Sequence, residues 1–60
     1  RARLEILDVR GRRVAVLVDG QLAAGAHHFT WQPAGEASGV YVARLAADGE
    51  VVTRRLVLLR

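Results

Sequence analysis

The sequence predicts an all-β sandwich or barrel of about five strands, and three observations support this fold class. Apolar and polar residues alternate over several short runs, which is the pattern of a strand with one buried face. Turn signals containing glycine separate these runs at intervals of about 8–12 residues. No segment has helical periodicity over a competing length. The chain has 60 residues, so we expect residues 1–60 to form a single domain.

The first predicted hairpin lies at the start of the chain. Ala2–Val9 alternates, with Leu4 and Ile6 on its apolar face. Arg10–Arg12 contains a glycine that can adopt positive φ, so this triplet predicts a turn. Arg13–Val18 is rich in valine and is predicted to be the returning strand.

The middle of the chain is predicted to hold one strand between two loops. Asp19–Gly20 is a second turn signal, and Gln21–Gly25 is too short for a helix. Ala26–Trp31 alternates again and predicts the third strand. Gln32–Gly39 contains the only proline and the only serine, together with two glycines, and is predicted to be a connecting loop.

The last two strands are predicted to form the second hairpin. Val40–Ala47 and Glu50–Leu59 are separated by Asp48–Gly49, a strong signal for a two-residue hairpin turn. That turn sets the register of the antiparallel pair. The predicted opposite pairs are Leu45 with Val52, Tyr41 with Leu56 and Ala43 with Arg54.

This register places Arg54 on the same face as apolar residues such as Leu56. Two interpretations are open. The arginine stem lies along the edge of the core with its charged end in water, or a bulge shifts the register.

The predicted core contains the three aromatic residues, because so small a domain needs its large apolar side chains inside. An alternative is that these rings form a platform for sugar stacking. The expected core residues are Leu4, Ile6, Val14, Leu17, Phe29, Trp31, Tyr41, Leu45, Val52, Leu56 and Leu58.

Composition argues against several kinds of function. The chain has no cysteine, so we expect neither a disulfide nor a thiolate. His27 and His28 are adjacent, and in a strand they point to opposite faces, which predicts no shared metal. Ser38 lacks the spacing of a nucleophile elbow. We therefore expect no catalytic residue, no metal and no cofactor. No apolar run approaches the length of a membrane helix.

Charged residues leave two alternatives open. Asp8 and Asp19 are interpreted as turn residues, with a calcium site as the alternative. All nine basic side chains are arginine, and the net charge is +3. Nucleic acid is not expected as a partner, because the aromatic residues that would stack on bases are assigned to the core. The arginines are interpreted as a solvated surface, with attraction to anionic glycolipid or to an acidic receptor groove as the alternative.

Four motifs together resemble a known family over nearly the whole chain. The sequence resembles the C-terminal sorting domain of type IX secretion cargo and its relative, the immunoglobulin-like domain of the flagellar hook-capping proteins. The motifs are an Asp-x-x-Gly-Arg turn (Asp8 to Arg12), an Ala-Gly-x-His segment (Ala24 to His27), Ser38-Gly39-Val40-Tyr41, and Arg54-Arg55 before the terminal apolar residues.

The resemblance implies an immunoglobulin-like antiparallel β-sandwich at the end of a larger secreted bacterial protein. It implies a non-catalytic module that is recognised by outer-membrane secretion and attachment machinery, reached through the periplasm, with a secreted or cell-surface location. The terminal strand is the part that the family associates with recognition. The corresponding residues here are Arg54, Arg55, Leu56, Val57, Leu58, Leu59 and Arg60.

One departure from the family concerns the strands that normally precede Ala2. The sandwich is expected to lack them, which would leave an unpaired edge. Strands from another chain, by strand exchange or homo-oligomer formation, would then complete it. Two other functions remain open: a structural immunoglobulin-like module of an extracellular assembly, and a carbohydrate-binding accessory domain.

Overall fold

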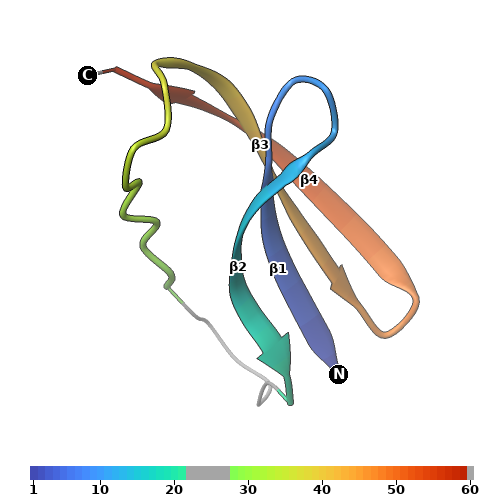
Figure 1. Ribbon diagram of the computed structural model, residues 1–60. Coiled ribbons are helices and arrows are strands. Elements are labelled where there is room, and N and C mark those ends of the chain that lie inside the picture. The colour runs from blue at the N-terminus through green and yellow to red at the C-terminus, as the bar shows by residue number, and fades with distance from the viewer. Residues whose placement is uncertain (22–27, 60) are drawn as a thin grey trace.

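Four β-strands make up the sheet of this protein. The computed structural model describes residues 1–21 and 28–59. These residues form the strands β1 (Ala2–Leu7), β2 (Arg13–Gly20), β3 (Gly39–Ala47) and β4 (Glu50–Leu58). The strands pair antiparallel in the order β2-β1-β3-β4 (Figure 1). The all-β prediction is confirmed, and the sheet is open, with β2 and β4 as its outer strands.

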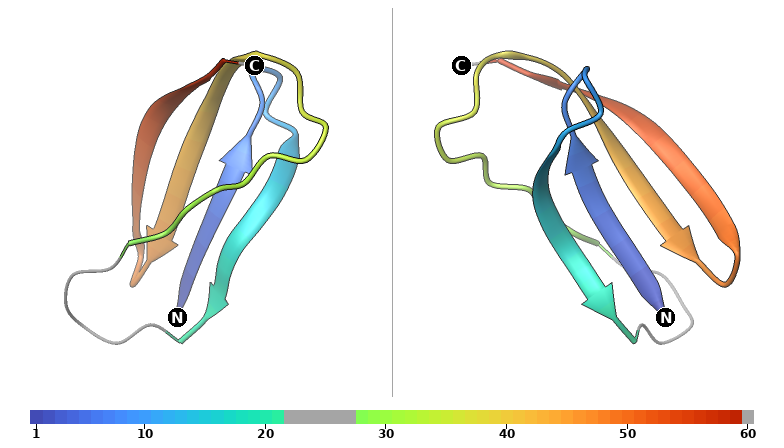
Figure 2. Two further views of the ribbon diagram at one scale, coloured as in Figure 1. Left: turned by 90° about the vertical axis from the view of Figure 1, so that its left-hand side faces the viewer. Right: turned by 45° about the vertical axis from the view of Figure 1, so that its right-hand side comes forward.

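The strand predicted over Ala26–Trp31 is wrong for residues 28–31, which are irregular. Ala26 and His27 lie outside the described residues. Residues 28–38, here called the crossover segment, lead into β3 across one face of the sheet (Figure 2, left). An extended segment alternates its side chains whether or not it pairs, which explains the misleading pattern. Among the described residues one sheet is present, not the two sheets of a sandwich.

The turn between β1 and β2 is held by the side chain of Asp8. Its Oδ1 accepts hydrogen bonds from the backbone N–H groups of Arg10 and Arg12, both at 2.9 Å. Gly11 has φ of 84°, a conformation that few other residues adopt at low cost. The turn therefore begins at Asp8, and β1 ends at Leu7 rather than at the predicted Val9.

The turn predicted at Asp19–Gly20 is wrong. These residues are the last two of β2, where they pair with Arg3 and Ala2. The carboxylate of Asp19 accepts a hydrogen bond from the Arg1 guanidinium at 2.8 Å. Pairing with β1 thus outweighs the local turn preference of this dipeptide.

The hairpin of β3 and β4 has the predicted register in all three predicted pairs. Asp48 and Gly49 have φ of 52° and 81°, as a two-residue turn with two left-handed residues requires. The nine pairs between these strands run without a shift. The alternative in which a bulge moves Arg54 is therefore wrong.

The two faces of the sheet differ in chemistry. We call the face that carries Leu4 and Ile6 the groove face, and the face that carries Glu5 the arginine face. The crossover segment covers part of the groove face, and Ile6 and Tyr41 are buried there at 1% and 7% exposure.

The predicted core is wrong for two residues, because Phe29 and Val52 are 42% and 43% exposed. The crossover segment runs obliquely across the sheet toward β2, so β4 is the least covered strand (Figure 2, left). The remaining predicted core residues are half-buried on this one-sided core: Leu4, Val14, Leu17, Trp31, Leu45, Leu56 and Leu58.

Candidate functional site: the outer strand β4

The predicted recognition residues lie at the end of β4 and just beyond it. Arg54–Leu58 belong to the strand and Leu59 follows it, while Arg60 lies outside the described residues. Val57 and Leu59 are 64% and 84% exposed. Among the described strands, β4 pairs only with β3, so its other side is an edge. The structure thus places Arg54–Leu58 of the predicted site on one outer strand.

Alternation along β4 divides these residues between the two faces. Leu56 pairs with Tyr41 and lies with Arg54 on the groove face. Arg55 pairs with Val42 and lies on the arginine face. Both arginines are exposed, and they occupy the middle of the strand.

The Arg54 side chain lies against its own strand. Its Nη1 donates a hydrogen bond to the backbone carbonyl oxygen of Thr53 at 3.0 Å. Thr53 pairs with Arg44, a non-hydrogen-bonded pair when counted from the turn, so its carbonyl points away from β3, toward the outer edge. Arg54 therefore covers one of the edge groups that an added strand would use.

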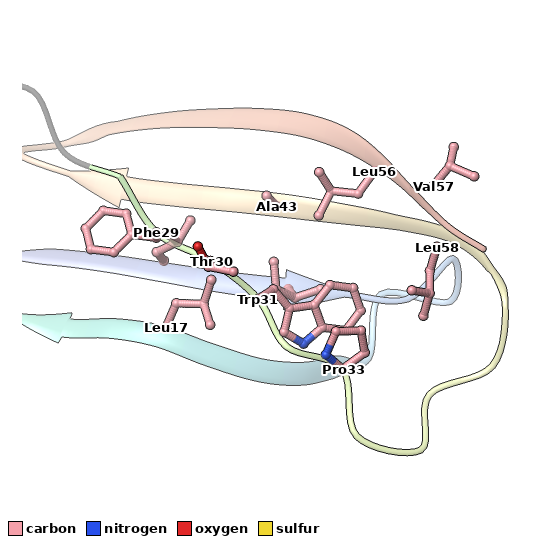
Figure 3. A pocket seen from close by; sticks show the side chains of 11 residues that line it. Leu17, Phe29, Thr30, Trp31, Pro33, Ala43, Leu56, Val57 and Leu58 are labelled. Atoms are coloured by element: carbon pink, nitrogen blue, oxygen red, sulfur yellow. The ribbon is translucent and has the colours of Figure 1, made fainter. Parts of the chain in front are cut away.

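A groove separates the C-terminal half of β4 from the crossover segment. Its volume is about 440 Å³. Trp31 and Pro33 form one side, and Leu56 and Leu58 extend from β4 toward them, whereas Val57 points away (Figure 3). The floor includes Ile6 of the central strand β1. The groove is almost wholly apolar and is suited to apolar side chains rather than to a charged ligand.

Two contacts of Tyr41 attach the crossover segment to β3. Its ring meets Trp31 edge-to-face, with centroids 5.1 Å apart and an interplanar angle of 66°. Its hydroxyl donates a hydrogen bond to the carbonyl oxygen of Ala37 at 2.6 Å. Such a ring pair stabilises the fold by about 0.5–1.5 kcal/mol in addition to the effect of burying its apolar area. The crossover segment, which forms one wall of the groove, is therefore attached to β3 at two points, Trp31 and Ala37.

The arginine face is organised around Glu5, which is 9% exposed. Its Oε2 lies 3.2 Å from Nη1 of Arg13 and 3.4 Å from Nε of Arg3. Its Oε1 lies 3.7 Å from Nη1 of Arg44. Three half-exposed guanidinium groups thus share one carboxylate, and the cluster keeps a net positive charge.

Sequence reasoning did not single out Glu5. The alternation of Arg3 and Glu5 in the first predicted strand was a partial signal, since it put both on one face. The other two arginines come from β2 and β3, whose neighbours depend on the strand order. That order requires β3 to pair with β1, which no local pattern indicates.

The two candidate calcium ligands are not brought together. Asp8 bonds to the turn that precedes β2, whereas Asp19 lies near the other end of that strand. Within residues 1–21 and 28–59, no group of three His, Asp or Glu side chains is placed to hold a metal ion. The turn interpretation of Asp8 is confirmed by its two backbone contacts.

Comparison with known proteins finds no match for this chain. No protein-family model, no curated protein and no solved structure matches it. Across the described ranges, the chain has no helix with the length and apolar character needed to cross a bilayer.

Proposed function

We propose that this chain is a non-catalytic module that directs secretion and cell-surface attachment of a larger bacterial protein. It acts through protein–protein contacts at β4, where a strand of the outer-membrane machinery pairs with the outer edge. The arginines of β4 contribute charge contacts to the same partner. The proposal combines the family resemblance of the sequence with the physical properties of this strand.

The observation that carries the proposal is the regularity of β4. It pairs with β3 over nine consecutive residue pairs without a bulge. Its other side carries the unpaired backbone groups of an outer strand, and such edges accept added strands. Exposed valines on the same strand, Val51 and Val57, offer apolar surface to a neighbour.

Deletion of Arg54–Arg60 from the full-length protein tests the proposal in the producing bacterium. We expect the attached protein to accumulate in the periplasm and to be lost from the cell surface, because the recognised strand is gone. The measurement is immunoblotting of periplasmic, surface and medium fractions.

A matched control separates recognition from unfolding. Replacing Arg54 and Arg55 by glutamate keeps the strand while reversing its charge, and export should fall in the same way. Normal export of both variants would refute the proposed function.

We further propose that the sheet is one layer of an immunoglobulin-like sandwich, completed by strands from outside residues 1–60 or from another chain. The partly covered groove face supports this, since Leu56 and Leu58 border an open apolar groove. If a second copy completes the sandwich, light scattering of the 60-residue chain after size exclusion should reveal association. A folded monomer at all concentrations would contradict completion by a second copy.

A further inference from the structure

The outer edge of β4 separates two chemically different faces. Toward the groove face, Leu56 and Leu58 border the apolar groove. Toward the arginine face, Arg55 is exposed and pairs with Val42 of β3. Arg44 lies on β3 two residues beyond Val42. Side chains of a strand added at this edge would alternate between these two faces.

Backbone geometry indicates where pairing can occur. In a two-residue hairpin, the residues that flank the turn form a hydrogen-bonded pair, here Ala47 and Glu50. Hydrogen-bonded and non-hydrogen-bonded pairs then alternate, so Arg55 and Val57 direct their backbone N–H and C=O groups outward. Thr53 belongs to the same outward set, which agrees with the bond from Arg54 to its carbonyl oxygen. The edge that Arg54 leaves uncovered therefore starts at Arg55.

On the groove face, this open stretch needs apolar neighbours. Leu56 and Leu58 extend toward Trp31 and Pro33, and the groove between them has a volume of about 440 Å³ (Figure 3). An apolar side chain opposite Leu56 would pack beside it at the rim of this groove and lose part of its contact with water. A charged side chain placed there would lose part of its hydration to an apolar lining.

On the arginine face, the same stretch needs carboxylates. Arg3, Arg13 and Arg44 together meet only Glu5, and the carboxylate of Asp19 bonds to Arg1. Arg55 makes no ion pair with any described residue, so it adds a further uncompensated charge. Opposite charges on neighbouring strands stabilise pairing, and like charges oppose it.

We propose that the partner is a β-strand in which apolar residues alternate with aspartate or glutamate. It pairs with β4 along Arg55–Leu58, its apolar residues packing beside Leu56 and Leu58 at the rim of the groove and its carboxylates lying beside Arg55. This inference rests on the proposed addition of a strand to β4 and adds the chemistry of that strand. A second copy of β4 fits less well, because it would bring Arg54 and Arg55 near arginines of the same sequence.

Titration with synthetic peptides tests the inference. A capped peptide of alternating valine and glutamate is added to the 60-residue chain, and backbone amide signals are followed by NMR. We expect slowed hydrogen exchange at the amides of Arg55 and Val57. Two matched peptides, one with lysine for each glutamate and one with serine for each valine, should bind at least about tenfold more weakly.

Charge reversal in the protein provides the complementary test. Arg55→Glu should weaken binding of the glutamate peptide by about tenfold or more and strengthen binding of the lysine peptide. Arg12→Glu makes the same charge change beside the β1–β2 turn and should leave both affinities within about twofold. Circular dichroism of both variants checks that the sheet is retained.

The outcomes distinguish this inference from the proposal beneath it. Equal binding of the glutamate and lysine peptides at Arg55 and Val57 would overturn the acidic partner but keep strand addition. Protection at the amides of β2 instead of β4 would overturn the assignment of the edge. If no peptide protects either edge, strand addition itself fails, and the proposed function loses its mechanism.

Discussion

The two outer strands of the sheet, β2 and β4, differ in how far they can accept another strand. β2 pairs with β1 through a register that shifts twice, with Val14 and Leu17 as the extra residues. β4 pairs with β3 through nine pairs without a shift. Bulges bend and twist an edge, and this discourages further pairing. The sheet thus has one distorted edge and one regular edge.

The charged residues of the two edges follow the same division. On β2, Arg13 contacts Glu5 and Asp19 contacts Arg1. On β4, Arg54 only reaches the backbone of Thr53, and Arg55 has no ion pair with a described residue. Arginines on β4 keep a regular edge from pairing indiscriminately. The comparison indicates that bulges limit the pairing of another strand with β2, whereas exposed arginines limit it on β4.

The largest expected effect comes from β1, the strand that joins the first hairpin to the second by pairing with β3. Ile6→Ala should lower the free energy of unfolding by about 2–5 kcal/mol, because Ile6 is 1% exposed and its loss leaves a cavity. Urea unfolding followed by circular dichroism measures this loss. The control Leu59→Ala removes a side chain that is 84% exposed and should change stability by less than about 0.5 kcal/mol. If β4 kept its exchange protection in Ile6→Ala, the two edges would be independent units.

An intermediate effect is expected at the two hairpin turns. Gly49→Ala and Gly11→Ala each force alanine to positive φ, at 81° and 84°, with no atom near the added methyl group. Each should cost about 1–2 kcal/mol from backbone strain alone. Amide exchange should rise mainly in β3 and β4 for the first variant and mainly in β2 for the second. Unequal stability losses would show that one turn contributes more to the sheet than its geometry implies.

The smallest effect on stability, and the most direct test of the comparison, is expected for Arg54→Val. Removing this exposed guanidinium should change the free energy of unfolding by less than about 0.5 kcal/mol. It uncovers the carbonyl of Thr53, so light scattering should detect increased self-association. Arg12→Val, the same change beside β2, should leave the chain no more associated than before. Association of both variants alike would mean that added apolar surface, not the edge of β4, drives it.

Local sequence signals predicted the turn and register of the second hairpin, with strand ends within one residue, and predicted the first hairpin in part. Asp48 and Gly49 determine turn and register together, since two left-handed residues allow only one connection of this length. The register of the first hairpin could not be predicted, because the bulges at Val14 and Leu17 arise from pairing with β1. Their only local trace is a run of valines without clear alternation.

Features that depend on distant contacts could not be predicted. Trp31 alternates with Phe29 as a strand would, yet the segment crosses the sheet instead of joining it. The cluster at Glu5 needs arginines from three strands, and their proximity follows from the pairing of β1 with β3. For the candidate site, the sequence located its residues on the last strand. The hydrogen bond from Arg54 to the carbonyl oxygen of Thr53 depends on a side-chain conformation that no sequence pattern encodes.

The contact between Trp31 and Tyr41 has a practical consequence. They are the only tryptophan and the only tyrosine in the chain, and their rings lie 5.1 Å apart. One ring belongs to the crossover segment and the other to β3. Indole emission therefore reports the contact between that segment and β3, while the amide infrared band reports the sheet. Two optical readings on one unlabelled sample can reveal whether the groove opens before the strands separate.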